Sequence, residues 1–179
     1  MALRSSQPYD SNKITDIFPK KHVRLHRKDI VDILYSNRNS IRFHIYGPPK
    51  LYDLYPECYR GFVKYEDCPK VFSNSKISLC IHATSFNNYG KYLYFSERLP
   101  QILASYGLLY TDTIYDGLLV PDMNYILADP INPLEQINNI IKSYNSHKYQ
   151  QIKKNGYETA IKYMTWNNML DKIDYISNS

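Results

Sequence analysis

The sequence has little of what marks a secreted, membrane-spanning or zinc-binding protein. Its 179 residues include only three cysteines, at positions 58, 68 and 80, without the CxxC spacing typical of metal sites. No apolar run approaches the roughly 20 residues of a membrane-spanning helix. The first residues also lack the apolar region of a signal peptide. We therefore expect a cytoplasmic protein in a reducing compartment, with Cys80 as a thiol in the core.

Two nucleotide-binding signatures are missing as well. No GxGxxG pattern follows the first expected strand, which argues against a nicotinamide-binding domain. The sequence also has no DxD motif, the pattern that would indicate a metal-bound diphosphate.

The formal net charge of +5 is modest, and the basic residues are densest at 20–28 (KKHVRLHRK). This cluster fits a solvated helix face, a diphosphate site or an anionic partner. We do not expect nucleic acid as the partner, because nucleic-acid binders concentrate a larger charge on one face. Strong loss of binding with added salt would favour that alternative.

Tyrosine is unusually frequent, with 19 copies. Tyr, Asn, Lys and Ile are all favoured by AT-rich codons, so genome composition explains the excess more simply than stacking on carbohydrate. The composition indicates an AT-rich source, such as a large virus, a protist or a low-GC bacterium.

Apolar segments with strand and helix periods alternate along the chain. The strands expected are 14–18, 41–46, 59–63, 76–82, 108–110 and 123–128. The helices expected are 22–36, 66–74, 133–144, 148–164 and 166–176, with a helical turn within 50–56. Alternation of this kind favours a parallel α/β sheet with helices on both faces. We expect residues 1–12 to form a flexible segment or linker and residues 13–179 to form one domain.

The segment 96–112 (SERLPQILASYGLLYTD) is the most informative in the chain. Ser96 can cap the first turn of a helix, and Pro100 lies where no intrahelical N–H is needed. Gly107 can adopt the left-handed conformation that ends a helix. The apolar residues 108–110 then predict a strand buried on both faces. Arg98, at the helix start, adds a planar cation suited to phosphate.

This segment resembles the donor site of GT-B glycosyltransferases, of the group-1 type and the spore-protein-like (CgeB/YkvP-like) branch. The shared pattern is Ser-x-Arg-x-x-(Glu/Gln)-Ile-Leu-Ala-x-x-Gly-x-Leu-x-Thr-Asp. The resemblance extends from about residue 20 to 176. It implies a Rossmann-like domain that is one half of a GT-B fold, the half that binds a nucleotide-diphosphate sugar such as a UDP or GDP conjugate.

The resemblance also assigns roles to the loops at the carboxyl ends of the strands, where open α/β sheets bind ligands. Around the diphosphate it places Ser96 and Arg98, with Arg24 or Arg27 completing the clamp. At the ribose it places Gln101, and along the base it places Gly61, Val63, Lys64 and Tyr65. Near the sugar it places Asn88, Tyr89 and Gly90. No metal or other cofactor is implied.

One departure concerns catalysis. Retaining members of the larger class carry two Glu residues in the positions that Leu93 and Gln101 occupy here. The sequence therefore supports two readings. In the first, the chain is the donor-binding domain of a glycosyltransferase that works with an acceptor-binding domain on the same protein or on a partner chain. In the second, it is a catalytically inactive GT-B-like binding module.

For several side chains near this edge, the sequence leaves two interpretations open. His82, at the end of the clearest strand, either hydrogen-bonds a sugar hydroxyl or phosphate or simply bonds a backbone carbonyl. Asp112 and Asp116 either orient a ligand hydroxyl or cap a turn. His22 and His26 have the spacing of helical metal ligands but no third ligand, so we expect no metal there.

Overall fold

The computed structural model describes residues 26–82, 96–113, 115 and 118–165. Its centre is a parallel sheet of three strands in the order β1 (Ser78–Cys80), β2 (Leu109–Thr111) and β3 (Ile126–Leu127). Leu79 of β1 lies opposite Tyr110, and Tyr110 lies opposite Ile126 of β3. The expected α/β fold with a parallel sheet is therefore confirmed.

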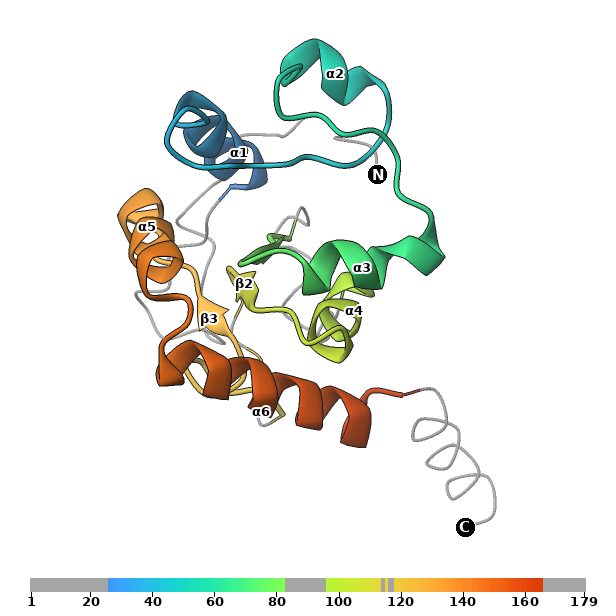
Figure 1. The fold of residues 1–179 in the computed structure, drawn as a ribbon, viewed down its shortest axis with the longest axis vertical. Coiled ribbons are helices and arrows are strands. Elements are labelled where there is room, and N and C mark those ends of the chain that lie inside the picture. The colour runs from blue at the N-terminus through green and yellow to red at the C-terminus, as the bar shows by residue number, and fades with distance from the viewer. Residues whose placement is uncertain (1–25, 83–95, 114, 116–117, 166–179) are drawn as a thin grey trace, which may run out of the picture.

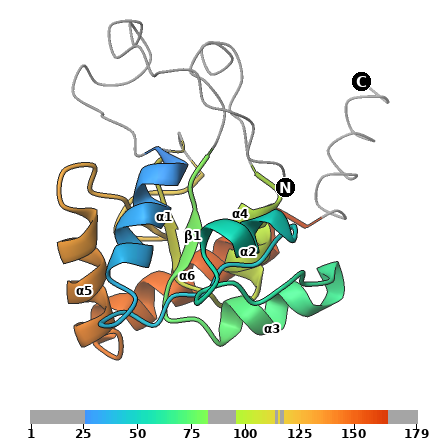
Figure 2. The same cartoon turned by 90° about the horizontal axis from the view of Figure 1, so that it is seen from above.

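Helices cover both faces of the sheet (Figures 1 and 2). They are α1 (Arg27–Ser36), α2 (Lys50–Leu54), the short 3-10 helix η2 (Tyr65–Asp67), α3 (Cys68–Ser73), α4 (Arg98–Ala104), α5 (Pro133–Ser143) and α6 (His147–Tyr163). In the described chain, no helix is long and apolar enough to cross a membrane.

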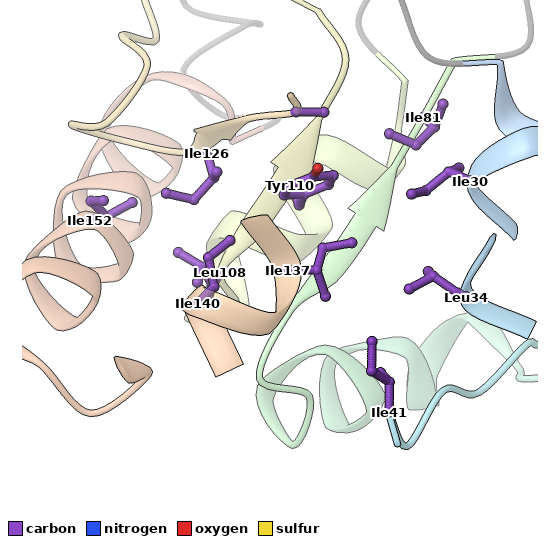
Figure 3. Close-up of a cluster of buried hydrophobic side chains, with 11 residues drawn as sticks. Ile30, Leu34, Ile41, Ile81, Leu108, Tyr110, Ile126, Ile137, Ile140 and Ile152 are labelled. Carbon is purple, nitrogen blue, oxygen red and sulfur yellow. The ribbon is translucent and has the colours of Figure 1, made fainter. Parts of the chain in front are cut away.

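The first core cluster lies between the sheet and the pair α1 and α5 (Figure 3). Ile30 and Leu34 are one helical turn apart, so both point from α1 toward the sheet. Tyr110 of β2 and Ile137 of α5 lie in the same cluster. Complete burial of an apolar side chain of this size contributes about 1.5–3 kcal/mol, so this cluster holds α1 on the sheet.

The second cluster lies on the opposite face, beneath α4 and α6. Leu99, Ile102 and Leu103 of α4 are fully buried there, together with Leu109 of β2 and Ala160 of α6. The short run Leu108–Tyr110 alternates between the two clusters, and all three side chains have no exposed surface. The predicted strand buried on both faces is confirmed.

Two expected strands, 41–46 and 59–63, are much shorter than predicted. They meet in a single parallel bridge between Ile45 and Tyr59. The Ile45 N–H donates to the Cys58 carbonyl and the Arg60 N–H donates to the Ile45 carbonyl, both at 2.9 Å. Gly61, with a φ of +85°, adopts the left-handed conformation just after the bridge, and its carbonyl accepts one more hydrogen bond from the Gly47 N–H at 2.9 Å.

The end of α4 corrects the expected role of Gly107. The left-handed residue is Tyr106, with a φ of 57°. The Gly107 N–H donates to the Ile102 carbonyl and the Tyr106 N–H donates to the Leu103 carbonyl, at 2.9 and 3.0 Å, which is a Schellman ending. A Cβ on Gly107 would lie 2.9 Å from the Ile102 carbonyl oxygen. Glycine is required here for space rather than for its backbone angles.

Gly107→Ala is therefore expected to destabilise the domain by about 1–3 kcal/mol, the usual cost of forcing extra atoms into a packed site. Chemical denaturation of the variant and the parent measures the difference. Ala104→Ser, an exposed change on the same helix, is the control and should stay within about 0.5 kcal/mol. Equal stability of the two variants would contradict the close contact.

The remaining helices and strands agree with the expected positions to within a few residues at each end. The predicted strand 14–18, the helix 166–176 and the flexible segment 1–12 lie outside the described residues.

Candidate functional site

Polar side chains gather where β1 and β2 end at the carboxyl edge of the sheet. His82 follows β1, and Asp112 and Thr113 follow β2. The Asp112 carboxylate accepts hydrogen bonds from the His82 backbone N–H at 3.2 Å and from Thr113 Oγ1 at 3.3 Å. His82 Nδ1 lies 3.1 Å from the same Asp112 oxygen, and both side chains are only 1% exposed.

This contact fixes the orientation of the His82 ring. His82 Nδ1 also lies 3.1 Å from Thr113 Oγ1, so both residues that follow β2 contact this ring nitrogen. His82 Nε2 lies 3.5 Å from the Tyr115 hydroxyl. Thr111 Oγ1 lies 3.2 Å from the same hydroxyl and donates to the Cys80 carbonyl at 2.9 Å. The strand ends therefore form one buried polar network.

Arg27 brings a guanidinium to this edge from the start of α1. Its Nε and Nη2 atoms donate to the Ile81 carbonyl at 2.8 and 2.7 Å. This fork-shaped pairing holds the cation at the end of β1, one residue from His82.

Arg98 and Ser96 reach the same edge from the start of α4. Burial raises the pKa of the Cys80 thiol, and the nearby Arg98 charge and Ser96 hydroxyl oppose that rise. Asp112 and Arg27 also act on this thiol, so charged and polar groups from three separate segments lie near the end of β1. Cys80 is 1% exposed, which confirms the expected core thiol.

Ser96 differs in detail from the expected helix cap. The residue that precedes α4 is Glu97, whose side chain makes no capping bond. Ser96 Oγ instead accepts from the Arg98 N–H at 3.4 Å, a long contact. Gln101 lies one turn further along α4 and is partly exposed.

The residues expected along the base form a separate loop. The Gly61 carbonyl accepts from the Gly47 N–H at 2.9 Å, and the Lys64 carbonyl accepts from the Cys68 thiol at 3.4 Å. Lys64 and Tyr65 are exposed and Val63 is half-buried. A Cβ on Gly61 would meet nothing within 4 Å, so its backbone borders open space. The described hydrogen bonds join this loop to Gly47 and α3 rather than to Arg98.

Other expected site residues lie outside the described part of the chain: Arg24, Asn88, Tyr89, Gly90, Leu93 and Asp116. His22 lies outside it too, and His26 is 3.8 Å from Asp29 on the exposed start of α1. Among the described residues, no cluster of three His, Cys, Asp or Glu side chains could hold a metal ion.

The family model described as glycosyl transferase-like matches residues 26–174, most of the chain. The chain belongs to this glycosyl transferase-like family. No match is found among curated proteins. Open parallel α/β sheets bind ligands at the carboxyl edge of the sheet. In this domain that edge carries Arg27, His82, Arg98 and Asp112.

Sequence reasoning placed His82 at this edge but missed what holds it. One oxygen of Asp112, Oδ1, contacts both the backbone N–H and the ring of His82. Thr113 and Tyr115 were not singled out at all. The signal that could have found them is positional: they directly follow a buried strand, and neighbouring parallel strands end at the same edge.

Proposed function

We propose that this glycosyl transferase-like domain binds the nucleotide-diphosphate part of a sugar donor at the carboxyl edge of its sheet. The observation that carries the proposal is the Arg27 guanidinium at the end of β1, on the Ile81 carbonyl beside the His82–Asp112 pair, with Arg98 at the start of α4 acting on the neighbouring Cys80 thiol. Guanidinium groups match phosphate oxygens in geometry and in charge. The cations, rather than the short helix α4, are the expected diphosphate anchor.

In this proposal the domain contributes electrostatics and orientation. Arg98 and Arg27 neutralise the charge that develops on the leaving diphosphate, which lowers the barrier to transfer. The buried polar network keeps His82 in one position at the edge of the sugar site. Gln101 hydrogen-bonds a ribose hydroxyl, and the open backbone of Gly61 lies along the base. The acceptor is held by a second domain on the same protein or on a partner chain.

Arg98→Ala is expected to weaken binding of the nucleoside diphosphate by ten-fold to a hundred-fold, because a charge-assisted hydrogen bond contributes about 1.5–3 kcal/mol. Calorimetric titration with UDP, GDP and their common sugar conjugates measures this loss and identifies the base. Lys70→Ala, which removes an exposed cation on α3, is the matched control and should bind like the parent. Thermal unfolding of both variants separates lost binding from lost folding. Equal affinity of the parent and the Arg98 variant would remove Arg98 from the site.

Gln101 favours a second candidate function, a binding module without transferase activity. An amide can hydrogen-bond a hydroxyl, but it supplies no charge where the related enzymes have a carboxylate. Donor binding without any transfer, measured with the complete protein and its acceptor domain, would support this second function.

A further inference from the structure

A second hollow lies beside the bridge between Ile45 and Tyr59. Its volume is about 340 Å³. It is lined by Arg38, Asn39, Arg42, Phe43, His44, Glu57, Cys58 and Arg60. Arg27, at the start of α1, contacts the end of β1, whereas Arg38 follows the far end of the same helix (Figure 2). Ten helical residues span about 15 Å, so the Arg38 end of the hollow lies away from Arg27 of the proposed donor site, whereas Arg60 directly precedes Gly61 of the base loop.

The charges around the hollow do not balance. Its one carboxylate, on Glu57, is taken by Arg38, with Nη2 and Oε1 3.1 Å apart, and by the Tyr35 hydroxyl. Arg60 is anchored to the backbone, because its Nη1 donates to the carbonyls of Glu57 and Tyr59 at 2.8 Å. Arg42 makes no hydrogen bond or ion pair with any other residue in the described part of the chain. Among the described residues, neither Arg42 nor Arg60 has a carboxylate partner.

His44 lies near both of these charges. Burial lowers the pKa of His44, and the nearby Arg60 and Arg42 lower it further, so the ring is neutral at pH 7. A neutral imidazole offers one donor and one acceptor, and the Asn39 amide offers donors and an acceptor as well. Phe43 supplies an apolar wall. The hollow thus combines two guanidinium groups with neutral polar and apolar surface.

We propose that this hollow binds a small phosphate monoester, such as a sugar phosphate, with its phosphate between Arg42 and Arg60. Paired guanidinium groups are the side chains best suited to phosphate oxygens. A volume of about 340 Å³ falls at the lower end of the range for small-molecule sites. The cations meet in one concave place rather than along a face, which favours a compact anion over a nucleic acid.

The test is an NMR titration of the full chain at pH 7 with glucose 6-phosphate, with glucose and inorganic phosphate as separate probes. The signal of the His44 ring, assigned with His44→Gln, should shift with glucose 6-phosphate and not with glucose. Arg42→Gln should weaken this binding at least ten-fold. Lys154→Gln removes one positive charge from α6, on the other side of the molecule (Figure 1), and should bind like the parent.

Three results would overturn the proposal. The first is a His44 signal that stays in place at saturating glucose 6-phosphate. The second is equal affinity of the parent and Arg42→Gln. The third is an equal loss in Arg42→Gln and Lys154→Gln, because that would reflect the net charge of the protein and not a site. If inorganic phosphate shifts the His44 signal as strongly as glucose 6-phosphate does, the result supports the phosphate contact. It then shows that the sugar contributes nothing to binding.

Discussion

Leu103→Ala is expected to lower the free energy of unfolding by about 2–5 kcal/mol. Leu103 has no exposed surface and lies in the core cluster between α4 and α6. Its Cδ2 atom fills the space over Gly156, where a Cβ would come within 2.8 Å of it. Because glycine has no side chain that could move into the gap, a cavity remains after truncation. The loss should therefore lie in the upper half of the range.

Urea denaturation of the parent and the variant measures this loss. Ile131→Ala removes the same kind of apolar surface from a side chain that is 81% exposed, and it should change stability by less than about 0.5 kcal/mol. If the two variants lost equal stability, α4 would not pack on α6 as described. The helix that carries Arg98 would then be held in some other way.

Asp112→Ala is expected to lower the free energy of unfolding by about 3 kcal/mol or more. The change removes the carboxylate oxygen that the His82 N–H, His82 Nδ1 and Thr113 Oγ1 all contact, while the contact between Nδ1 and Oγ1, 3.1 Å apart, remains. Each buried donor that loses its partner costs about 1–3 kcal/mol, although relaxation recovers part of that cost. Asp112→Asn keeps one oxygen in place, so its loss should be smaller.

Chemical denaturation should rank the two variants, with Asn between the parent and Ala. Asp53→Ala, which removes an exposed carboxylate from α2, is the control for a general charge effect and should change little. Equal losses in Asp112→Ala and Asp53→Ala would show that the His82–Asp112 contact contributes nothing to the fold.

The sequence predicted the elements well where the determinants are local. The side chains of 108–110 form a short continuous apolar run, and the structure buries all of them. Ile30 and Leu34 are one turn apart, and they define the buried face of α1. The left-handed ending of α4 was placed one residue too late. The hydrogen bond from the Gly107 N–H to the Ile102 carbonyl depends on where the last helical turn ends, and the local sequence does not determine that point.

The candidate site was only partly predictable, because its contacts are long-range. The strand-end rule brings His82 and Asp112 to one edge, but their contact requires β1 and β2 to be neighbours in the sheet. The bond from Arg27 to the Ile81 carbonyl joins residues 54 positions apart. The hollow of Arg38, Arg42 and Arg60 could not be predicted from the sequence, because it depends on one short bridge between Ile45 and Tyr59.

The most direct test of the donor site is an amide NMR titration of the chain with UDP and with GDP. We expect one of them to shift the signals of His82, Arg98 and Asp112 most strongly, because these residues surround the end of β1. The signals of Arg42 and His44, in the second hollow, should move less. Shifts centred on Arg42 and His44, or no shift with either nucleotide, would contradict a donor site at the carboxyl edge of the sheet.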